Sequence, residues 1–204
     1  MRNRKEKESR LDEKSLWPLG VICVDGNIIL GSGQDVERSI RMICEHNEKI
    51  KGYDPDRLEN VSTGVLNVAD DYSEWEHHRD VLYIHAGLND GPEDWEAPWG
   101  EHNSPRAYLN AIAALDFLVD GRDTVYVCCH GGASRSCFVV CLYLSWVYGA
   151  DFHKTVDAVK RRYERMNIHP KHIDRLPHLQ QMLGDMPGSR CSLYWRDIGM
   201  LAMS

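Results

Sequence analysis

The most informative part of the sequence is Val125-Tyr-Val-Cys-Cys-His-Gly-Gly-Ala-Ser-Arg-Ser136. The apolar residues 125–128 predict a short buried strand, and the apolar run 134–147 predicts a buried helix. Cys129 therefore lies where a strand ends, and Arg135 lies where a helix begins. The first turn of a helix leaves its backbone N–H groups without helical partners, and the helix dipole makes that end positive. This stretch therefore predicts an anion-binding site.

The position of Cys129 also predicts a reactive thiolate at this site. A free thiol has a pKa of about 8.5, and a helix N-terminus with nearby cations lowers it to about 3.5–7.5. Arg135 adds a planar guanidinium that holds a phosphate through two parallel hydrogen bonds. Gly132 permits a positive φ and the close approach of a ligand, and the Ser136 hydroxyl is placed to hydrogen-bond the thiolate when it leaves. The alternative is an inert, buried cysteine in an ordinary strand–loop–helix connection.

The residues Cys129-His-Gly-Gly-Ala-Ser-Arg-Ser136 resemble the active-site loop of the cysteine-dependent protein tyrosine phosphatases. The Ser-Arg-Ser ending is most similar to the dual-specificity branch, as are the Leu30-Gly-Ser32 triplet after a predicted hairpin and the Val-Leu-Asn strand at 65–67. One position departs from the family pattern, because a histidine usually precedes the nucleophile and this chain has Cys128 there. The resemblance covers about residues 19–183, and the two adjacent cysteines are candidates for redox regulation.

The resemblance implies a phosphomonoester hydrolase that acts through a cysteinyl-phosphate intermediate and requires no metal or cofactor. Cys129 would be the nucleophile, Arg135 would hold the phosphate, and Ser136 would ease the departure of the thiolate. The expected substrate is a phosphorylated protein or peptide that carries phosphotyrosine, with phosphoserine and phosphothreonine as further substrates. The residues expected to bind the phosphate are His130, Gly131, Gly132, Ala133, Ser134 and Arg135.

The reaction also needs a proton donor for the leaving oxygen. Candidate acidic residues flank or follow the predicted strand 81–84, and they are Asp80, Asp90, Glu93, Asp94, Glu96 and Glu101. The general acid of the family follows this strand, so the resemblance assigns the role to Asp90, with Asp94 as the second candidate. Trp95 and Trp99 lie in the same segment and predict either a lid that stacks on an aryl phosphate or anchors for an inserted loop.

Hydrophobic periodicity along the rest of the chain predicts an α/β fold, with a mixed central sheet of about five strands flanked by helices, as in the dual-specificity phosphatases. The expected strands are 21–24, 28–30, 65–68, 81–84 and 125–128, and Asp25-Gly-Asn27 predicts a hairpin turn between the first two. The expected helices are 35–50 with Asp35 as N-cap, 104–121 starting with Ser104 and Pro105, 134–147, 151–166 with Asp151 as N-cap, and 170–183 with a bend near Pro177.

Composition places these elements in one domain with a charged N-terminal tail. The chain has 204 residues and a formal net charge of −7, which argues against a nucleic-acid-binding surface. Residues 17–185 form the predicted catalytic domain, residues 1–16 a charged tail predicted to be disordered, and residues 186–204 a C-terminal tail without a predicted role. Seven cysteines without disulfide-framework spacing, no apolar run that could span a membrane and no signal-peptide pattern indicate a cytoplasmic protein.

Several alternative functions are open at this point. Cys128 in place of histidine keeps open a catalytically weak pseudophosphatase that binds phosphorylated partners. A phosphatase of phosphoinositides or RNA 5' ends is less favoured, because such relatives often carry lysine in the loop and residues 130–134 contain none. A sulfur-transfer or arsenate-reducing enzyme fits less well, because the loop lies late in the chain. The predicted helix 151–166 has one basic face, which we interpret as a solvated surface or, less favoured, as a docking face for an acidic partner. Its residues are Lys154, Lys160, Arg161, Arg162 and Arg165.

Overall fold

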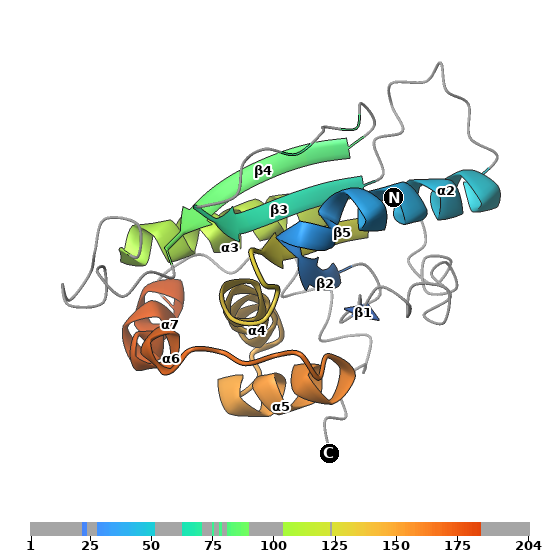
Figure 1. Cartoon of the computed structure of the whole chain (residues 1–204). Helices are drawn as coiled ribbons and strands as arrows, with labels where there is room; N and C mark the ends of the chain where they lie inside the picture. Colours follow the sequence, from blue (N-terminus) through green and yellow to red (C-terminus); the bar gives the residue numbers. More distant parts are fainter. Residues whose placement is uncertain are drawn as a thin grey trace.

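The computed structural model describes residues 22–23, 28–51, 63–70, 75, 78, 81–89, 104–122 and 124–184. Within these residues, five strands form one mixed sheet in the order β1-β2-β5-β3-β4 (Figure 1). The strands are β1 (Ile22–Cys23), β2 (Ile28–Ser32), β3 (Thr63–Ala69), β4 (Val81–Leu88) and β5 (Thr124–Cys129). β1 runs antiparallel to β2, and the other neighbouring strands are parallel. The predicted fold class is confirmed, while both tails and the turn 25–27 lie outside the described residues.

β4 is longer than the apolar pattern predicted. It continues past Ile84 to Leu88, although exposed His85 interrupts the run of apolar side chains. Pairing with β3 carries the extension, since Asn67 lies opposite His85 and Ala69 lies opposite Leu88. Strand pairing therefore extends β4 beyond the point where side-chain patterning stops. The extension brings the end of β4 to the same edge of the sheet as the end of β5, which is where α/β sheets place their ligands.

Helices cover both faces of this sheet (Figure 1). α2 (Val36–Lys51) covers one face, where its buried side chains share a small core with Tyr126 and Cys128. The main core lies on the other face, and the helices on that side are α3 (Pro105–Gly121), α4 (Arg135–Tyr148), α5 (Phe152–Arg162), α6 (Pro170–Asp174) and α7 (Leu176–Gly184). α4 lies between the sheet and α5, and every side chain from Arg135 to Ser145 is buried. None of the described helices is long and apolar enough to cross a membrane.

Asp35 is not the N-cap of α2, contrary to the sequence-based expectation. A short 3-10 helix, η3 (Gly33–Asp35), runs directly into Val36. The Asp35 carboxylate instead accepts a hydrogen bond from the Ser32 hydroxyl at 2.8 Å and lies 4.0 Å from the Arg165 guanidinium. Asp35 therefore links the end of β2 to the segment that follows α5.

The other predicted helix starts are present, but the last predicted helix is divided. The side chains of Ser104 and Asp151 accept backbone hydrogen bonds at 3.3 and 2.9 Å from the third residue after each. The predicted helix 170–183 is instead two helices, α6 and α7, which meet at Arg175. Pro177 explains the break, because proline lacks a backbone N–H and its ring clashes with the carbonyl four residues earlier.

Candidate active site

The alternation of side chains along β5 separates the two adjacent cysteines. Cys129 belongs to the main core on the α4 side, whereas Cys128 and Tyr126 belong to the small core on the α2 side. Successive residues of a strand point to opposite faces of a sheet, so this separation follows from the strand itself. Cys129 is 2 % exposed, and its Sγ lies 3.3 Å from the Ser136 Oγ. The structure therefore brings the predicted nucleophile into contact with the predicted helper hydroxyl.

Gly132 has the positive φ that its position in the loop suggested, at 67°. A Cβ atom at this residue would lie 2.5 Å from the Gly31 carbonyl oxygen and 2.8 Å from the Ser32 nitrogen. Both are backbone atoms of β2, the strand paired with β5, so they cannot move aside without moving the sheet. Glycine is therefore required for the loop to turn against β2.

The loop is held by hydrogen bonds from two segments that are distant in sequence. One is η3, and the other is the irregular segment after α5, a helix that ends at Arg162 rather than at the predicted residue 166. The bonds run from Gly33 N–H to His130 O at 3.2 Å, from Asn167 N–H to Ala133 O at 2.8 Å, and from His169 N–H to the Ser134 hydroxyl at 3.0 Å. All three are accepted by oxygen atoms of the loop. The carbonyls of His130 and Ala133 are thus turned outward from the loop. Because C=O and N–H point in opposite directions in a trans peptide, the N–H of the residue after each is turned toward the inside of the loop.

Arg135 is anchored at the ends of two neighbouring strands. Its side chain is only 3 % exposed, and its Nη1 donates to the Leu88 carbonyl oxygen at 2.8 Å and to the Asp70 carboxylate at 3.3 Å. Leu88 is the last residue of β4, and Asp70 directly follows β3. These contacts fix the guanidinium at the edge of the sheet where β5 enters the loop. Sequence reasoning missed Asp70, although an acidic residue two positions after the predicted strand 65–68 was an available signal.

Cys128 and Cys137 are buried thiols that differ from Cys129 in their surroundings. Burial, and then the nearby Cys129, raises the pKa of both thiols well above its usual value. Cys137 donates to the Gly132 carbonyl oxygen at 3.4 Å, and Cys128 makes a long contact of 3.8 Å with the Leu66 carbonyl oxygen. Both therefore remain protonated at neutral pH. Cys128, which stands where the family usually has histidine, packs in the small core and does not face the loop.

The predicted general acid and the predicted lid lie outside the described residues, and they comprise Asp90, Asp94, Trp95 and Trp99. The described chain reaches Asn89, directly after Leu88. The Leu88 carbonyl oxygen accepts a hydrogen bond from Arg135, and Asn89 is the last described residue before the gap. The roles of these residues therefore stay predictions.

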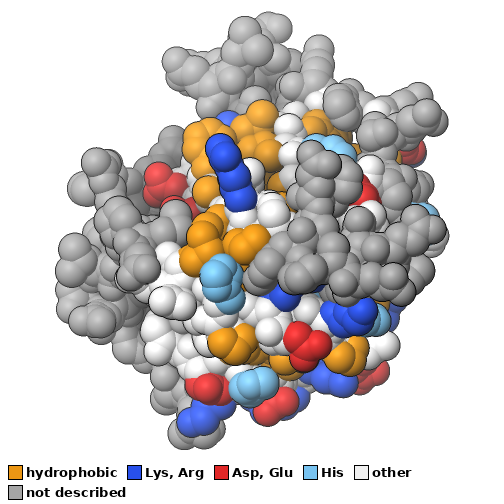
Figure 2. Space-filling view, turned by 90° about the vertical axis from the view of Figure 1, so that its left-hand side faces the viewer, with side chains coloured by type: hydrophobic (Ala, Val, Ile, Leu, Met, Phe, Trp, Pro, Cys, Tyr) orange, Lys and Arg blue, Asp and Glu red, His pale blue; other side chains and the backbone are white. Residues whose placement is uncertain are grey.

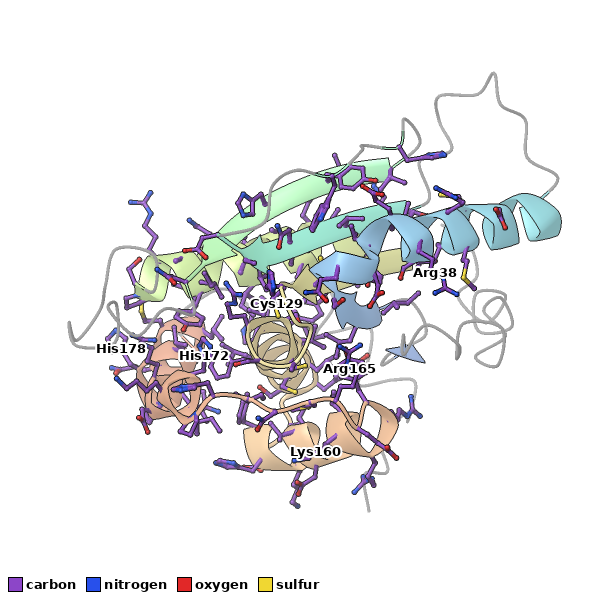
Figure 3. All side chains as sticks on the ribbon, in the orientation of Figure 1. Arg38, Cys129, Lys160, Arg165, His172 and His178 are labelled. Carbon is purple, nitrogen blue, oxygen red and sulfur yellow. The ribbon has the colours of Figure 1, made fainter. Side chains whose placement is uncertain are left out.

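Charged and histidine side chains lie on both sides of α4 (Figure 3). His130 is exposed, and its Nε2 lies 3.3 Å from the Gln34 Nε2. Arg165 lies on one side of α4, and His172 and His178 lie on the other (Figure 3). On the face toward which β3 and β4 point, acidic, basic and histidine side chains alternate with hydrophobic ones (Figure 2). The basic side chains predicted on one face of the helix 151–166 are all exposed, and Arg165 lies beyond the end of α5 at Arg162.

No protein-family model matches this chain, and no curated protein does. Solved structures match it over most of its length. Human DUSP28 is 18% identical over 81% of this chain and 95% of its own, with a TM-score of 0.59. A mouse putative dual specificity phosphatase complexed with zinc tungstate is 16% identical over 81% of this chain and 89% of its own, with a TM-score of 0.61. The human tyrosine phosphatase-like serine/threonine/tyrosine-interacting protein is 14% identical over 79% of this chain and 96% of its own, with a TM-score of 0.58.

These similarities concern the backbone, since at most 18% of the aligned residues in these three structures are identical to those of this chain. They extend over 79–81% of this chain. The chain has the fold of the dual-specificity phosphatases.

Proposed function

We propose that this protein is a metal-independent, cysteine-based phosphatase that hydrolyses phosphotyrosine in proteins or peptides, with phosphoserine and phosphothreonine as further substrates. One observation carries the proposal: a single strand–loop–helix unit assembles Cys129, Ser136 and Arg135 around the turn at Gly132. The Cys129 Sγ and the Ser136 Oγ are 3.3 Å apart, and Arg135 is anchored at the ends of β3 and β4. The dual-specificity phosphatase fold supports the same activity.

The reaction would proceed in two displacements at phosphorus. In the first, the Cys129 thiolate attacks in line, so that an S–P bond forms while the P–O bond to the leaving group breaks. The inward N–H groups of residues 130–135 and the Arg135 guanidinium would hold the three equatorial oxygens. In the second, water attacks phosphorus and the electrons of the S–P bond return to Cys129. The hydroxyl of Ser136 would stabilise the departing thiolate by donating a hydrogen bond to it.

Asp90 is the proposed general acid and base. It would protonate the leaving oxygen in the first displacement and accept a proton from the attacking water in the second. Two facts support this choice over Asp94: the family places its acid just after this strand, and the carbonyl of Leu88, two residues earlier in the chain, contacts Arg135.

The residues between the nucleophile and Arg135 favour a substrate with one phosphate monoester. They are His130, Gly131, Gly132, Ala133 and Ser134, and none is lysine. A headgroup with several phosphates would require further cations in or near the loop. This composition supports a phosphorylated protein or peptide over phosphoinositides and RNA 5' ends. Parallel assays on phosphopeptides and on phosphoinositide vesicles distinguish the two substrate classes.

The decisive experiment compares Cys129→Ser with Cys128→Ala in hydrolysis of p-nitrophenyl phosphate and of a phosphotyrosine peptide. The first variant should lose turnover and still bind orthovanadate, because the loop and Arg135 remain. The second should keep turnover, because Cys128 packs on the opposite face of β5. Full activity in Cys129→Ser would overturn the proposal. A wild-type protein that binds vanadate without hydrolysing either substrate would instead be a pseudophosphatase.

The same assay distinguishes the two candidate acids. Asp90→Asn should lower kcat most for substrates with poor leaving groups, because these depend most on protonation. Asp94→Asn serves as the comparison in the same segment of the chain. If only Asp94→Asn lowers kcat, and only for poor leaving groups, then Asp94 is the acid.

A further inference from the structure

Tyr126 precedes Cys129 by three residues on β5 and points to the opposite face of the sheet. Its side chain is fully buried, and its Oη donates a hydrogen bond to the Ser32 carbonyl oxygen at 2.9 Å. The Ser39 hydroxyl of α2 makes a longer bond to the same phenol oxygen, at 3.4 Å. Burial raises the pKa of Tyr126, so the phenol stays protonated and keeps its role as a donor.

The carbonyl that accepts from Tyr126 belongs to the peptide group that holds the phosphate loop. Ser32 C=O and Gly33 N–H are the two ends of one planar peptide. The Gly33 N–H donates to the His130 carbonyl oxygen at 3.2 Å. Two hydrogen bonds in series thus join Tyr126 to the residue that follows the nucleophile. Hydrogen bonds in series polarise one another, so donation to Ser32 O strengthens donation by Gly33 N–H.

The next peptide extends this connection into the loop. His130 C=O and Gly131 N–H share a trans peptide and point in opposite directions. The carbonyl is turned toward Gly33, so the Gly131 N–H is turned toward the inside of the loop. That side is where the proposed phosphate would bind.

Contact between side chain and backbone supports the same arrangement. A Cβ atom on Gly31 would overlap the Tyr126 phenol, and one on Gly132 would lie 2.5 Å from the Gly31 carbonyl oxygen. The end of β2 therefore lies between the phenol and the loop, in contact with both. The ring packs against Gly31, and the hydroxyl donates to the carbonyl of the peptide that follows.

We propose that Tyr126 is a positioning residue of the phosphate loop, which acts through the Ser32–Gly33 peptide to orient the Gly131 amide toward a bound anion. The effect on anion binding rests on the proposed function. The effect on the Gly33 amide rests on the hydrogen bonds alone.

The test compares Tyr126→Phe with Ser39→Ala in the whole chain. Phenylalanine keeps the ring over Gly31 and removes the donor to Ser32 O, whereas Ser39→Ala removes a buried hydroxyl from the same phenol and keeps that donor. The readouts are competitive inhibition by orthovanadate and hydrogen exchange of the Gly33 amide, followed by NMR. Tyr126→Phe should weaken vanadate inhibition and speed Gly33 exchange, each by about two- to tenfold, the effect of one net hydrogen bond. Ser39→Ala should change both readouts less than Tyr126→Phe does, because it removes a longer bond, at 3.4 Å, and keeps the donor to Ser32 O.

Each outcome has a defined meaning. Wild-type exchange of Gly33 in Tyr126→Phe would overturn the inference, even if the variant melts at a lower temperature. Faster exchange with unchanged vanadate inhibition would overturn the link to the Gly131 amide. If the wild-type protein neither binds vanadate nor hydrolyses phosphate esters, the proposed function fails, and the exchange comparison still tests whether Tyr126 holds the loop.

Discussion

Replacing Gly132 with alanine perturbs the phosphate loop in a way that the structure allows us to quantify. At a φ of 67°, the left-handed conformation costs an L-residue about 1–2 kcal/mol. The new methyl group would also lie 2.5 Å from Gly31 O, 2.6 Å from Gly31 C and 2.8 Å from Ser32 N. These are backbone atoms of a paired strand, so the loop itself must shift. Such overpacking costs about 1–3 kcal/mol more, and the sum is about 2–5 kcal/mol of unfolding free energy.

Gly149 provides a matched control for the conformational part of this cost. It ends α4 at a φ of 62°, and a Cβ atom there would meet no atom within 4 Å. Gly149→Ala should therefore lose only about 1–2 kcal/mol and keep its turnover. The difference between the two alanine variants isolates the contact of Gly132 with β2.

Thermal unfolding and steady-state kinetics measure the two effects. For a chain of this length, each kcal/mol lowers the melting temperature by about 2–4 °C. Gly132→Ala should melt below Gly149→Ala, and its kcat/KM should fall at least about tenfold, because small displacements of positioning groups reduce rates strongly. Equal melting temperatures together with full turnover in Gly132→Ala would refute the close packing of the loop against β2.

Two further predictions concern the anchor of Arg135 and the buried thiols. Asp70→Ala should lower kcat/KM by about five- to twentyfold, because the guanidinium loses its charge-assisted bond at 3.3 Å. Asp70→Asn should recover part of the loss, and a wild-type kcat/KM in the alanine variant would contradict this prediction. Burial raises the pKa of Cys128, Cys137 and Cys141 in the folded protein. The stability that these neutral thiols contribute is therefore complete below the pKa of the unfolded thiols. It is lost as the pH rises above about 9. Urea unfolding at about pH 8 and about pH 10 measures this loss, and Cys141→Ala should reduce it; an equal loss in variant and wild type would count against the buried thiol as its source.

The phosphate loop could be predicted from sequence because its chemistry and its local structure lie in one continuous stretch. Residues 125–136 contain the strand, the glycine with positive φ and the start of the helix. The five strands were also predictable, since each carries a short apolar run. β4 extends further than predicted because pairing with β3, and not its own side chains, defines its end.

The supports of the loop could not be predicted, because they depend on residues far apart in the chain. Asp70 contacts Arg135 across 65 positions, and Tyr126 contacts Ser32 across 94. Neither contact has a local sequence pattern. Asp35 was misassigned for a related reason, since its carboxylate interacts with Ser32 and Arg165 rather than with the first turn of α2. The sequence therefore predicted the elements from the pattern of side chains within each, but it did not predict the contacts between elements.

The register between β2 and β5 connects the stability of the sheet to the geometry of the loop. Gly31 pairs with Cys128, and Ser32 pairs with Cys129, so the end of β2 lies beside the start of the loop. A slip of one residue along β5 would turn Cys129 to the α2 side and Tyr126 to the α4 side. It would also separate the phenol from Gly31. The contacts of Tyr126 and Gly132 with β2 depend on this register, and they lie against the loop. Changes that loosen the end of β2 should weaken anion binding before they unfold the sheet.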